Sequence, residues 1–275
     1  MTLHVVATPI GNLGDITARA VDVLTRVGLI ACEDTRRTGS LLRHLGVERT
    51  RMMVVNDHTE RGAVDRIVER LVAGEEIALV SDAGTPLVSD PGHVLVRAAI
   101  AAGVTVEAVP GASAVLVALV TSGLATDRFA FDGFLPRKGL ERSRRIAEVV
   151  AADRTTVLFE APHRLARTLA DLAALTGDQR GVVVARELTK LHEEVWRGTI
   201  GDAVERAAVG EPRGEHVIVL EAAPDVPTGD DDVLRELQRA LDGGASRRDA
   251  IDEVARSLGV ARNHVYQLAL ALDGD

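Results

Sequence analysis

Apolar residues in the first half of the chain fall into short continuous runs that alternate with longer stretches of helical periodicity. Short apolar runs bounded by glycine and proline predict strands, and the longer periodic stretches predict helices. The predicted strands cover residues 3–10, 29–34, 51–56, 76–80 and 105–111. The first predicted helix begins near Thr17. Further helices are predicted over 40–47 and 62–75, from His93 onward, and over 112–123. This alternation predicts an α/β domain with a mostly parallel sheet and right-handed crossovers.

The second half of the chain repeats the alternation with different residues. Its predicted strands cover 129–134, 155–161, 181–187 and 216–222, and its predicted helices follow the basic stretch 136–145 and cover 163–175. A polar interval containing Trp196 separates the last two strands. The predicted fold class is α/β, with one α/β domain at 1–117, a second at 118–223, and a linker rich in proline and aspartate at 223–232.

A helical tail is predicted over residues 229–275. Within it, Ala255, Gly259 and Val265 have the spacing of a helix-turn-helix, in which alanine lets two helices approach, glycine takes the turn and valine fills the core. The pattern is short, so unrelated sequences easily contain it by chance. Two interpretations therefore stay open, a tail that binds nucleic acid and a helical hairpin that only packs.

The composition narrows the cellular setting. The chain has 275 residues, of which 46% are hydrophobic and 2% aromatic, and no apolar run is long enough to cross a bilayer. The first residues lack the pattern of a secretory signal, so we expect a cytoplasmic protein without membrane contact. Its single cysteine, Cys32, has no partner for an internal disulfide and is expected to be a small buried apolar residue.

The formal net charge of −9 argues against RNA binding, because phosphates attract basic surfaces. Two arginine-rich stretches, Arg36–Arg43 and Arg137–Arg145, can nevertheless form one basic face on an acidic body. The competing interpretation is that both stretches are solvated helix faces.

Three loops rich in glycine and proline follow predicted strands, at residues 8–15, 81–92 and 109–114. Open α/β sheets bind ligands at the carboxyl ends of their strands, and glycines there allow the backbone to approach a flat ligand closely. The first loop is not G-x-G-x-x-G, and no P-loop motif occurs, which argues against dinucleotide or phosphate chemistry. No H-E-x-x-H or G-x-S-x-G motif occurs either, so we expect no metal and no serine hydrolase mechanism.

Eight ordered segments between about residue 4 and residue 222 carry a resemblance to a known family. They are ATPIGNLGDIT, ACEDTRRTGSLLRHLG, VSDAGTPLVSDPG, VPGASA, FDGFLPRKG, FEAPHRL, ARELTKLHEE and GEHVIVLEA. They look like the tetrapyrrole methylase superfamily and, within it, resemble the bacterial subgroup that 2′-O-methylates a cytidine of small-subunit (16S) ribosomal RNA. The helical tail also resembles that subgroup.

The resemblance implies two α/β domains with S-adenosylmethionine in the cleft between them, and usually a homodimer. Relatives that act on tetrapyrroles carry G-x-G-x-G-D in the first loop and G-D-P in the second. This chain departs from both, with Thr8 to Gly11 in the first loop and Gly84 to Pro86 in the second, which is the form of the ribosomal subgroup. The competing functions are a tetrapyrrole or protein methyltransferase of the same fold, and a non-catalytic RNA-binding module.

Matching the motifs position by position implies the following cofactor contacts: Pro9, Gly11, Gly84, Thr85, Val88, Ser113, Ala114, Phe159, Ala185 and His216. Gly11 and Gly84 can instead be turn glycines, Phe159 and Ala185 core residues, and His216 a structural histidine.

A carboxylate or histidine near the loops can take the proton of a ribose hydroxyl. The candidates are Asp34, Asp57, His58, Asp82, Asp90 and Glu160. We favour Asp34 and Glu160, because each ends a predicted apolar strand, although helix capping or ion pairing also explains them. The predicted phosphate contacts are Arg36, Arg37, Arg137, Lys138, Arg142, Arg144, Arg145 and Arg164.

Overall fold

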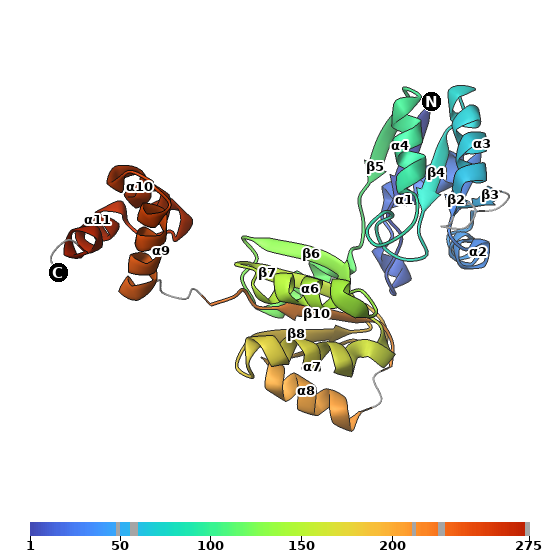
Figure 1. The fold of residues 1–275 in the computed structure, drawn as a ribbon. Coiled ribbons are helices and arrows are strands. Elements are labelled where there is room, and N and C mark those ends of the chain that lie inside the picture. Colours follow the sequence, from blue (N-terminus) through green and yellow to red (C-terminus); the bar gives the residue numbers. More distant parts are fainter. Residues whose placement is uncertain (48–49, 56–59, 211–212, 225–228, 273–275) are drawn as a thin grey trace. The chain divides into compact units, whose positions relative to one another are not determined.

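The computed structural model describes residues 1–47, 50–55, 60–210, 213–224 and 229–272 (Figure 1). The chain divides into two compact units, Met1–Ala223 and Pro224–Asp275. The first unit contains two five-stranded sheets. Within the described ranges, no helix is long and apolar enough to cross a membrane.

The first sheet is entirely parallel, with the strand order β3-β2-β4-β1-β5. Its strands are β1 (Thr2–Val6), β2 (Leu29–Cys32), β3 (Arg51–Val54), β4 (Ile77–Val80) and β5 (Thr105–Val109). The helices of this half are α1 (Ala18–Arg26), α2 (Thr35–His44), α3 (Glu60–Val72) and α4 (His93–Ala101), with a 3-10 turn η1 (Leu13–Asp15). The predicted parallel sheet is therefore confirmed for this half, and Thr17 caps α1 as expected.

Helices cover both faces of the first sheet. Residues of α3 and α4 pack with Leu3, Leu29 and Ile77 on one face, and residues of α1 and α2 pack with Val6 and Ile30 on the other. Both faces are apolar, so the strands read as continuous hydrophobic runs. Cys32 is fully buried in this core, as predicted.

The second sheet is mixed, with the order β6-β7-β10-β8-β9. Its strands are β6 (Phe129–Phe134), β7 (Thr155–Glu160), β8 (Gly181–Arg186), β9 (Glu194–Thr199) and β10 (His216–Leu220). Only β6 and β7 pair in parallel, and the other three pairings are antiparallel. A mostly parallel sheet is wrong for this half, because the hairpin between β8 and β9 reverses the chain and β10 then inserts between β7 and β8.

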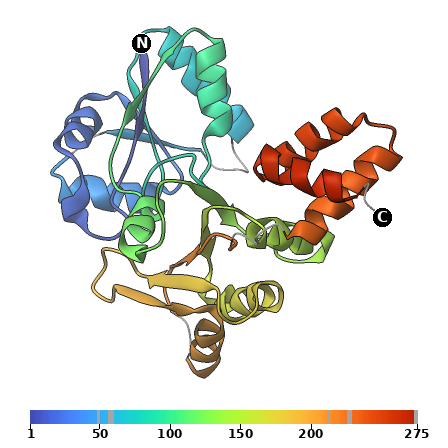
Figure 2. The ribbon, with the colours of Figure 1, turned by 90° about the vertical axis from the view of Figure 1, so that its left-hand side faces the viewer.

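The interval around Trp196 is not a polar connection, since it forms β9 and then α8 (Ile200–Val209). Helices α6 (Gly139–Val150), α7 (Leu165–Thr176) and α8 pack on one face of the second sheet. A 3-10 turn, η2 (Pro162–Arg164), directly precedes α7. Figure 2 shows α7 and α8, in yellow and orange, side by side, as their extensive contacts require.

Helix α5 (Ala114–Ser122) packs on the opposite face of the second sheet, through Val115, Ala118 and Leu119. The predicted domain boundary at residue 117 falls inside this helix. α5 buries its apolar side against β7, β9 and β10, so it packs with the second sheet, within the single compact unit Met1–Ala223.

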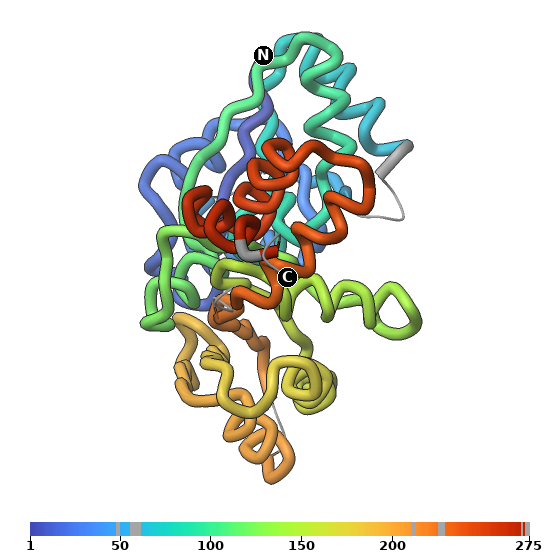
Figure 3. Tube along the Cα trace, turned by 60° about the vertical axis from the view of Figure 1, so that its left-hand side comes forward, coloured from blue at the N-terminus to red at the C-terminus, as the bar shows by residue number. Residues whose placement is uncertain are grey.

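The second unit is a bundle of α9 (Asp230–Asp242), α10 (Arg247–Ser257) and α11 (Arg262–Ala271), traced in orange and red in Figure 3. Gly259 has φ +64° in the turn between α10 and α11, and Val265 is fully buried in the bundle core. The predicted helix-turn-helix geometry is therefore present. The predicted linker is too long, because Asp230, Asp231 and Asp232 form the first turn of α9, where negative charge favours the helix dipole.

Candidate functional site

A cavity of about 490 Å³ lies where the three loops rich in glycine and proline meet the second sheet. The loops gather there because parallel strands end at one edge of a sheet. Seven of the residues predicted to contact the cofactor line the cavity: Gly84, Thr85, Val88, Ser113, Ala114, Phe159 and His216. The cavity is also lined by three apolar residues that were not predicted from the sequence, Ile10, Leu188 and Val217.

Backbone hydrogen bonds join the loops that form the cavity. The amide of Thr8 donates to the carbonyl of Gly84 at 2.9 Å, and the amide of Gly84 donates back at 3.1 Å. The hydroxyl of Thr85 then donates to the carbonyl of Ala112 in the third loop. Gly84 has φ +80°, and a Cβ there would lie 3.1 Å from the side chain of Ile10. This glycine is therefore required both by its backbone conformation and by the close approach of the two loops.

Three residues predicted to contact the cofactor do not line the cavity, namely Pro9, Gly11 and Ala185. Pro9 is buried, and Ala185 is fully buried in the core under α5. A Cβ on Gly11 would lie only 3.1 Å from the carbonyl oxygen of Leu188, in the β8–β9 hairpin loop. Of these three positions, Pro9 and Ala185 are buried, whereas Gly11 is exposed close to the β8–β9 hairpin loop.

His216 is buried at the start of β10, with 4% of its surface exposed, and it lines the cavity. Its Nδ1 atom has no hydrogen-bond partner among the described residues. Burial lowers the pKa of this imidazole, and the nearby Arg186 acts in the same direction. The lowered pKa favours the neutral form of the ring. Alternation along β10 puts this side chain on the same face as Ile218 and Leu220, which pack under α7 and α8, beside Arg186 and Trp196.

Three carboxylates, Glu33, Asp82 and Asp90, line the polar side of the cavity together with Arg37. Burial is the main cause that raises the pKa of each carboxyl above its ordinary value. The Nε atom of Arg37 lies 3.4 Å from Oδ2 of Asp82, while Oδ1 of Asp82 is buried without a hydrogen-bond partner among the described residues. Arg37 therefore holds one oxygen of Asp82 at the polar side of the cavity, and the other oxygen is buried.

Asp34, one of the two favoured catalytic residues, does not line the cavity. Its side chain accepts a hydrogen bond from the amide of Arg36 as the N-cap of α2, and it also pairs with the Arg36 guanidinium at 2.7 Å. These hydrogen bonds lower the pKa of Asp34 to about 2. The helix begins at Thr35 rather than at residue 40, so Asp34 caps it and Glu33 faces the cavity. The other candidates Asp57 and His58 lie outside the described residues.

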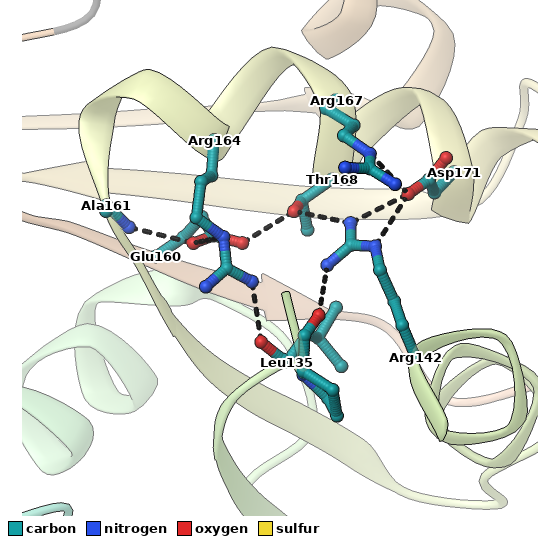
Figure 4. A network of polar contacts seen from close by, with 9 residues as sticks. Leu135, Arg142, Glu160, Ala161, Arg164, Arg167, Thr168 and Asp171 are labelled. Atoms are coloured by element: carbon teal, nitrogen blue, oxygen red, sulfur yellow. Dashed lines mark hydrogen bonds and ion pairs between the residues drawn. The ribbon is translucent and has the colours of Figure 1, made fainter. Parts of the chain in front are cut away.

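Glu160, the second favoured catalytic residue, lines the cavity, but its carboxylate is 2% exposed and already has three donors (Figure 4). It accepts hydrogen bonds from the amide of Ala161 at 2.9 Å and from the hydroxyl of Thr168 at 2.5 Å, and it pairs with Arg164 at 3.1 Å. A carboxylate saturated in this way positions its neighbours and has little capacity to accept a proton from a substrate.

Two predicted phosphate contacts, Arg142 and Arg164, are directed into the protein instead (Figure 4). Arg142 is 3% exposed, binds Asp171 and the hydroxyl of Thr168, and donates to the carbonyl of Pro136 at 3.0 Å. Arg164 donates to the carbonyl of Leu135 at 2.6 Å besides pairing with Glu160. Their guanidinium groups are occupied, so these two predictions are wrong.

The remaining predicted phosphate contacts lie at the surface. Arg36, Arg37, Arg144 and Arg145 each pair with a carboxylate. Arg137 and Lys138 are exposed in the segment between β6 and α6, and neither forms an ion pair or side-chain hydrogen bond with any residue in the described ranges. These two cations are the best placed to bind an anionic partner.

Comparison with protein families places a tetrapyrrole (corrin/porphyrin) methylase domain at residues 2–204. A second match, to the RsmI C-terminal HTH domain, covers residues 227–273 and so coincides with the helical tail. Together the two matches account for nearly the whole chain.

Curated relatives match over most of their length. The chain is 46% identical to the "Ribosomal RNA small subunit methyltransferase I" of Synechocystis sp., over 99% of both chains. It is 50% identical to the protein of the same name from Xylella fastidiosa (strain Temecula1), over 82% of both chains. Among solved structures, diphthine synthase superimposes with a TM-score of 0.62 at 17% identity, over 81% of this chain and 90% of that one, which shows the shared fold.

We expect Arg142→Ala to lower the free energy of unfolding by about 3 kcal/mol, because it removes a buried guanidinium that joins Asp171, the hydroxyl of Thr168 and the carbonyl of Pro136. The matched control is Arg144→Ala in the same helix, whose side chain is 81% exposed, and it should change stability by less than about 0.5 kcal/mol. Urea unfolding of both variants decides the matter, and equal stabilities would mean that Arg142 is a surface residue in solution.

Proposed function

Because the chain belongs to the tetrapyrrole methylase family, we propose that it transfers a methyl group from S-adenosylmethionine to the ribose 2′-hydroxyl of a cytidine in small-subunit (16S) ribosomal RNA. The observation that carries this proposal is the similarity, along nearly the whole chain, to relatives named ribosomal RNA small subunit methyltransferase I. The first two loops support it, since neither has the form found in relatives that act on tetrapyrroles.

The cavity residues fit S-adenosylmethionine. A volume of about 490 Å³ falls in the usual range of small-molecule sites, and the apolar wall around Val88, Ala114 and Phe159 suits an adenosine. When bound, the cofactor supplies an electrophilic methyl group on a sulfonium. The protein's task is to orient the ribose and exclude water from it.

We assign the proton acceptor to Asp82 in place of Asp34 and Glu160. Asp82 lines the cavity, so its carboxylate can take the proton of the 2′-hydroxyl as the oxygen attacks the methyl group, while Arg37 fixes the orientation of the carboxylate. Burial and, to a lesser degree, the charge of Asp34 raise the pKa of Asp82 and so its affinity for a proton, against the opposing effect of Arg37.

A ribosomal substrate supports the proposal that the enzyme works in the cytoplasm. The resemblance to the family further leads us to expect a homodimer, and the exposed residues Leu116 and Val120 on α5 offer an apolar face for it.

The decisive experiment supplies radiolabelled S-adenosylmethionine to the purified protein together with small ribosomal subunits, a tetrapyrrole and a protein extract. We expect the label in small-subunit RNA, at the 2′-oxygen of one cytidine. Label that enters only the tetrapyrrole or protein would favour another methyltransferase of this fold, and no transfer would favour a non-catalytic RNA-binding module.

Gly84→Val should abolish most of the affinity for S-adenosylmethionine, because the new side chain enters the space between Ile10 and the cavity. Gly123→Val is the matched control, since Gly123 has the same φ of +80° with no atom within 4 Å of its would-be Cβ. Both variants carry the strain of about 1–2 kcal/mol expected for this conformation. Calorimetric titration should show weak binding for Gly84→Val alone, and equal affinities would make Gly84 a turn residue only.

Asp82→Asn should lower kcat by about 100-fold or more while leaving S-adenosylmethionine affinity intact. The base must be ionised, and burial raises the pKa of Asp82, so wild-type activity should fall on acidification at a higher pH than an ordinary aspartate would give. This fall in activity at acidic pH should be absent from the residual activity of Asp82→Asn. Asp34→Asn, which keeps a capping side chain, serves as the control and should retain activity. A normal kcat for Asp82→Asn would exclude Asp82 as the base.

The double variant Arg137→Ala with Lys138→Ala should bind RNA less tightly and leave cofactor binding unchanged. Each lost phosphate contact should reduce the slope of log K against log salt by roughly 0.7–0.9. Arg144→Ala is the control, because Arg144 pairs with Glu148. Filter-binding assays over a range of salt concentrations measure the slope, and an unchanged slope would move the RNA contact elsewhere.

A further inference from the structure

A β-bulge in β6 changes which side chains face the cavity. The pairing of β6 with β7 shifts register between Phe131 and Gly133, and Gly133 has φ +61°. In an unbroken strand Phe131 and Phe134 would point to opposite faces, because their separation is odd. The bulge instead places Phe131 opposite Val157 and Phe134 opposite Phe159, on one face of the sheet.

Phe134 is the exposed member of the resulting aromatic group. Its ring meets Phe159 edge to face with centroids 5.6 Å apart, and Phe159 meets Phe131 at 4.8 Å. Phe134 lines the cavity while 52% of its surface stays exposed. The chain has only four phenylalanines, one tryptophan and one tyrosine, so three of its six aromatic residues gather at this one place.

The residues that follow Phe134 are held rigidly. Arg164 binds the carbonyl of Leu135, and Arg142 binds the carbonyl of Pro136 (Figure 4). Both arginines belong to the network around Glu160 and Thr168. The ring at the edge of the cavity is therefore presented by a fixed backbone, and the exposed cations Arg137 and Lys138 follow it directly in the chain.

We propose that Phe134 is a stacking platform for a nucleobase of the RNA, with Arg137 and Lys138 binding the adjoining phosphates. This inference rests on the proposed function and names the residue that positions the substrate base. Proteins hold single-stranded RNA by stacking bases on aromatic rings next to a cationic track. In a protein of net charge −9, stacking supplies affinity that long-range electrostatics does not.

The test compares Phe134→Leu, which keeps an apolar contact with Phe159, with Phe134→Tyr, which keeps the aromatic face. Phe129→Leu is the matched control, because Phe129 is 39% exposed at the other end of the same strand. Kinetics use small subunits that lack the modification. A separate binding assay uses a single-stranded RNA oligonucleotide that carries the fluorescent base pyrrolocytosine, whose emission is quenched by stacking.

Phe134→Leu should raise the KM for subunits by about 10-fold and remove the quenching, with the affinity for S-adenosylmethionine unchanged. Phe134→Tyr and Phe129→Leu should behave like the wild type. An equal loss of cofactor affinity in Phe134→Leu would assign the ring to the adenosine and overturn the proposal, as would an unchanged KM and unchanged quenching. A wild-type protein that neither methylates subunits nor binds RNA would instead overturn the proposed function itself.

Discussion

A buried carboxylate at the end of β7 determines how the second half of the molecule is assembled. Glu160 is 2% exposed, and a charge at such a position must be matched by donors. Arg164 and Thr168 supply them from the turn and helix that follow, and Thr168 passes the network on to Arg142 in α6. One polar network thereby fixes β7, α6 and α7 with respect to one another. It also holds the carbonyls of Leu135 and Pro136, directly after Phe134, which lines the cavity.

The sequence predicts the first half of the fold well because local and tertiary signals agree there. Strands buried on both faces are continuous apolar runs, and parallel pairing follows from their alternation with helices. The second half is different, since β9 is a half-exposed edge strand whose alternation is blurred by Glu194 and Arg197. Alanines make up much of the buried side of α8, which weakens its apolar pattern. Only the capping box formed by Thr199 and Asp202 marks where this helix begins.

The candidate site shows the same division. Glycine and proline after predicted strands mark the three loops, and the resemblance to the family then placed Gly84, Thr85 and Ser113 at the ligand site, where they line the cavity. Side-chain direction is harder to predict, because a helix that begins at Thr35 turns Asp34 into a cap and leaves Glu33 facing the cavity. Arg142 offered a signal in its spacing from Ile146 and Val149, which puts it on the buried stripe of α6. The bulge that redirects Phe134 depends on pairing with β7, which no local pattern reveals.

The charge of the protein constrains how it can hold RNA. Phosphates are repelled by a body of net charge −9, although salt screens that repulsion beyond about 10 Å. Arginines such as Arg36 and Arg144 already neutralise carboxylates and add little attraction of their own. On the proposed function, the exposed cations Arg137 and Lys138 beside Phe134 offer short-range contacts that arginines paired with carboxylates do not. Such a surface would discriminate by stacking, because it favours RNA that can bring an unpaired base to Phe134.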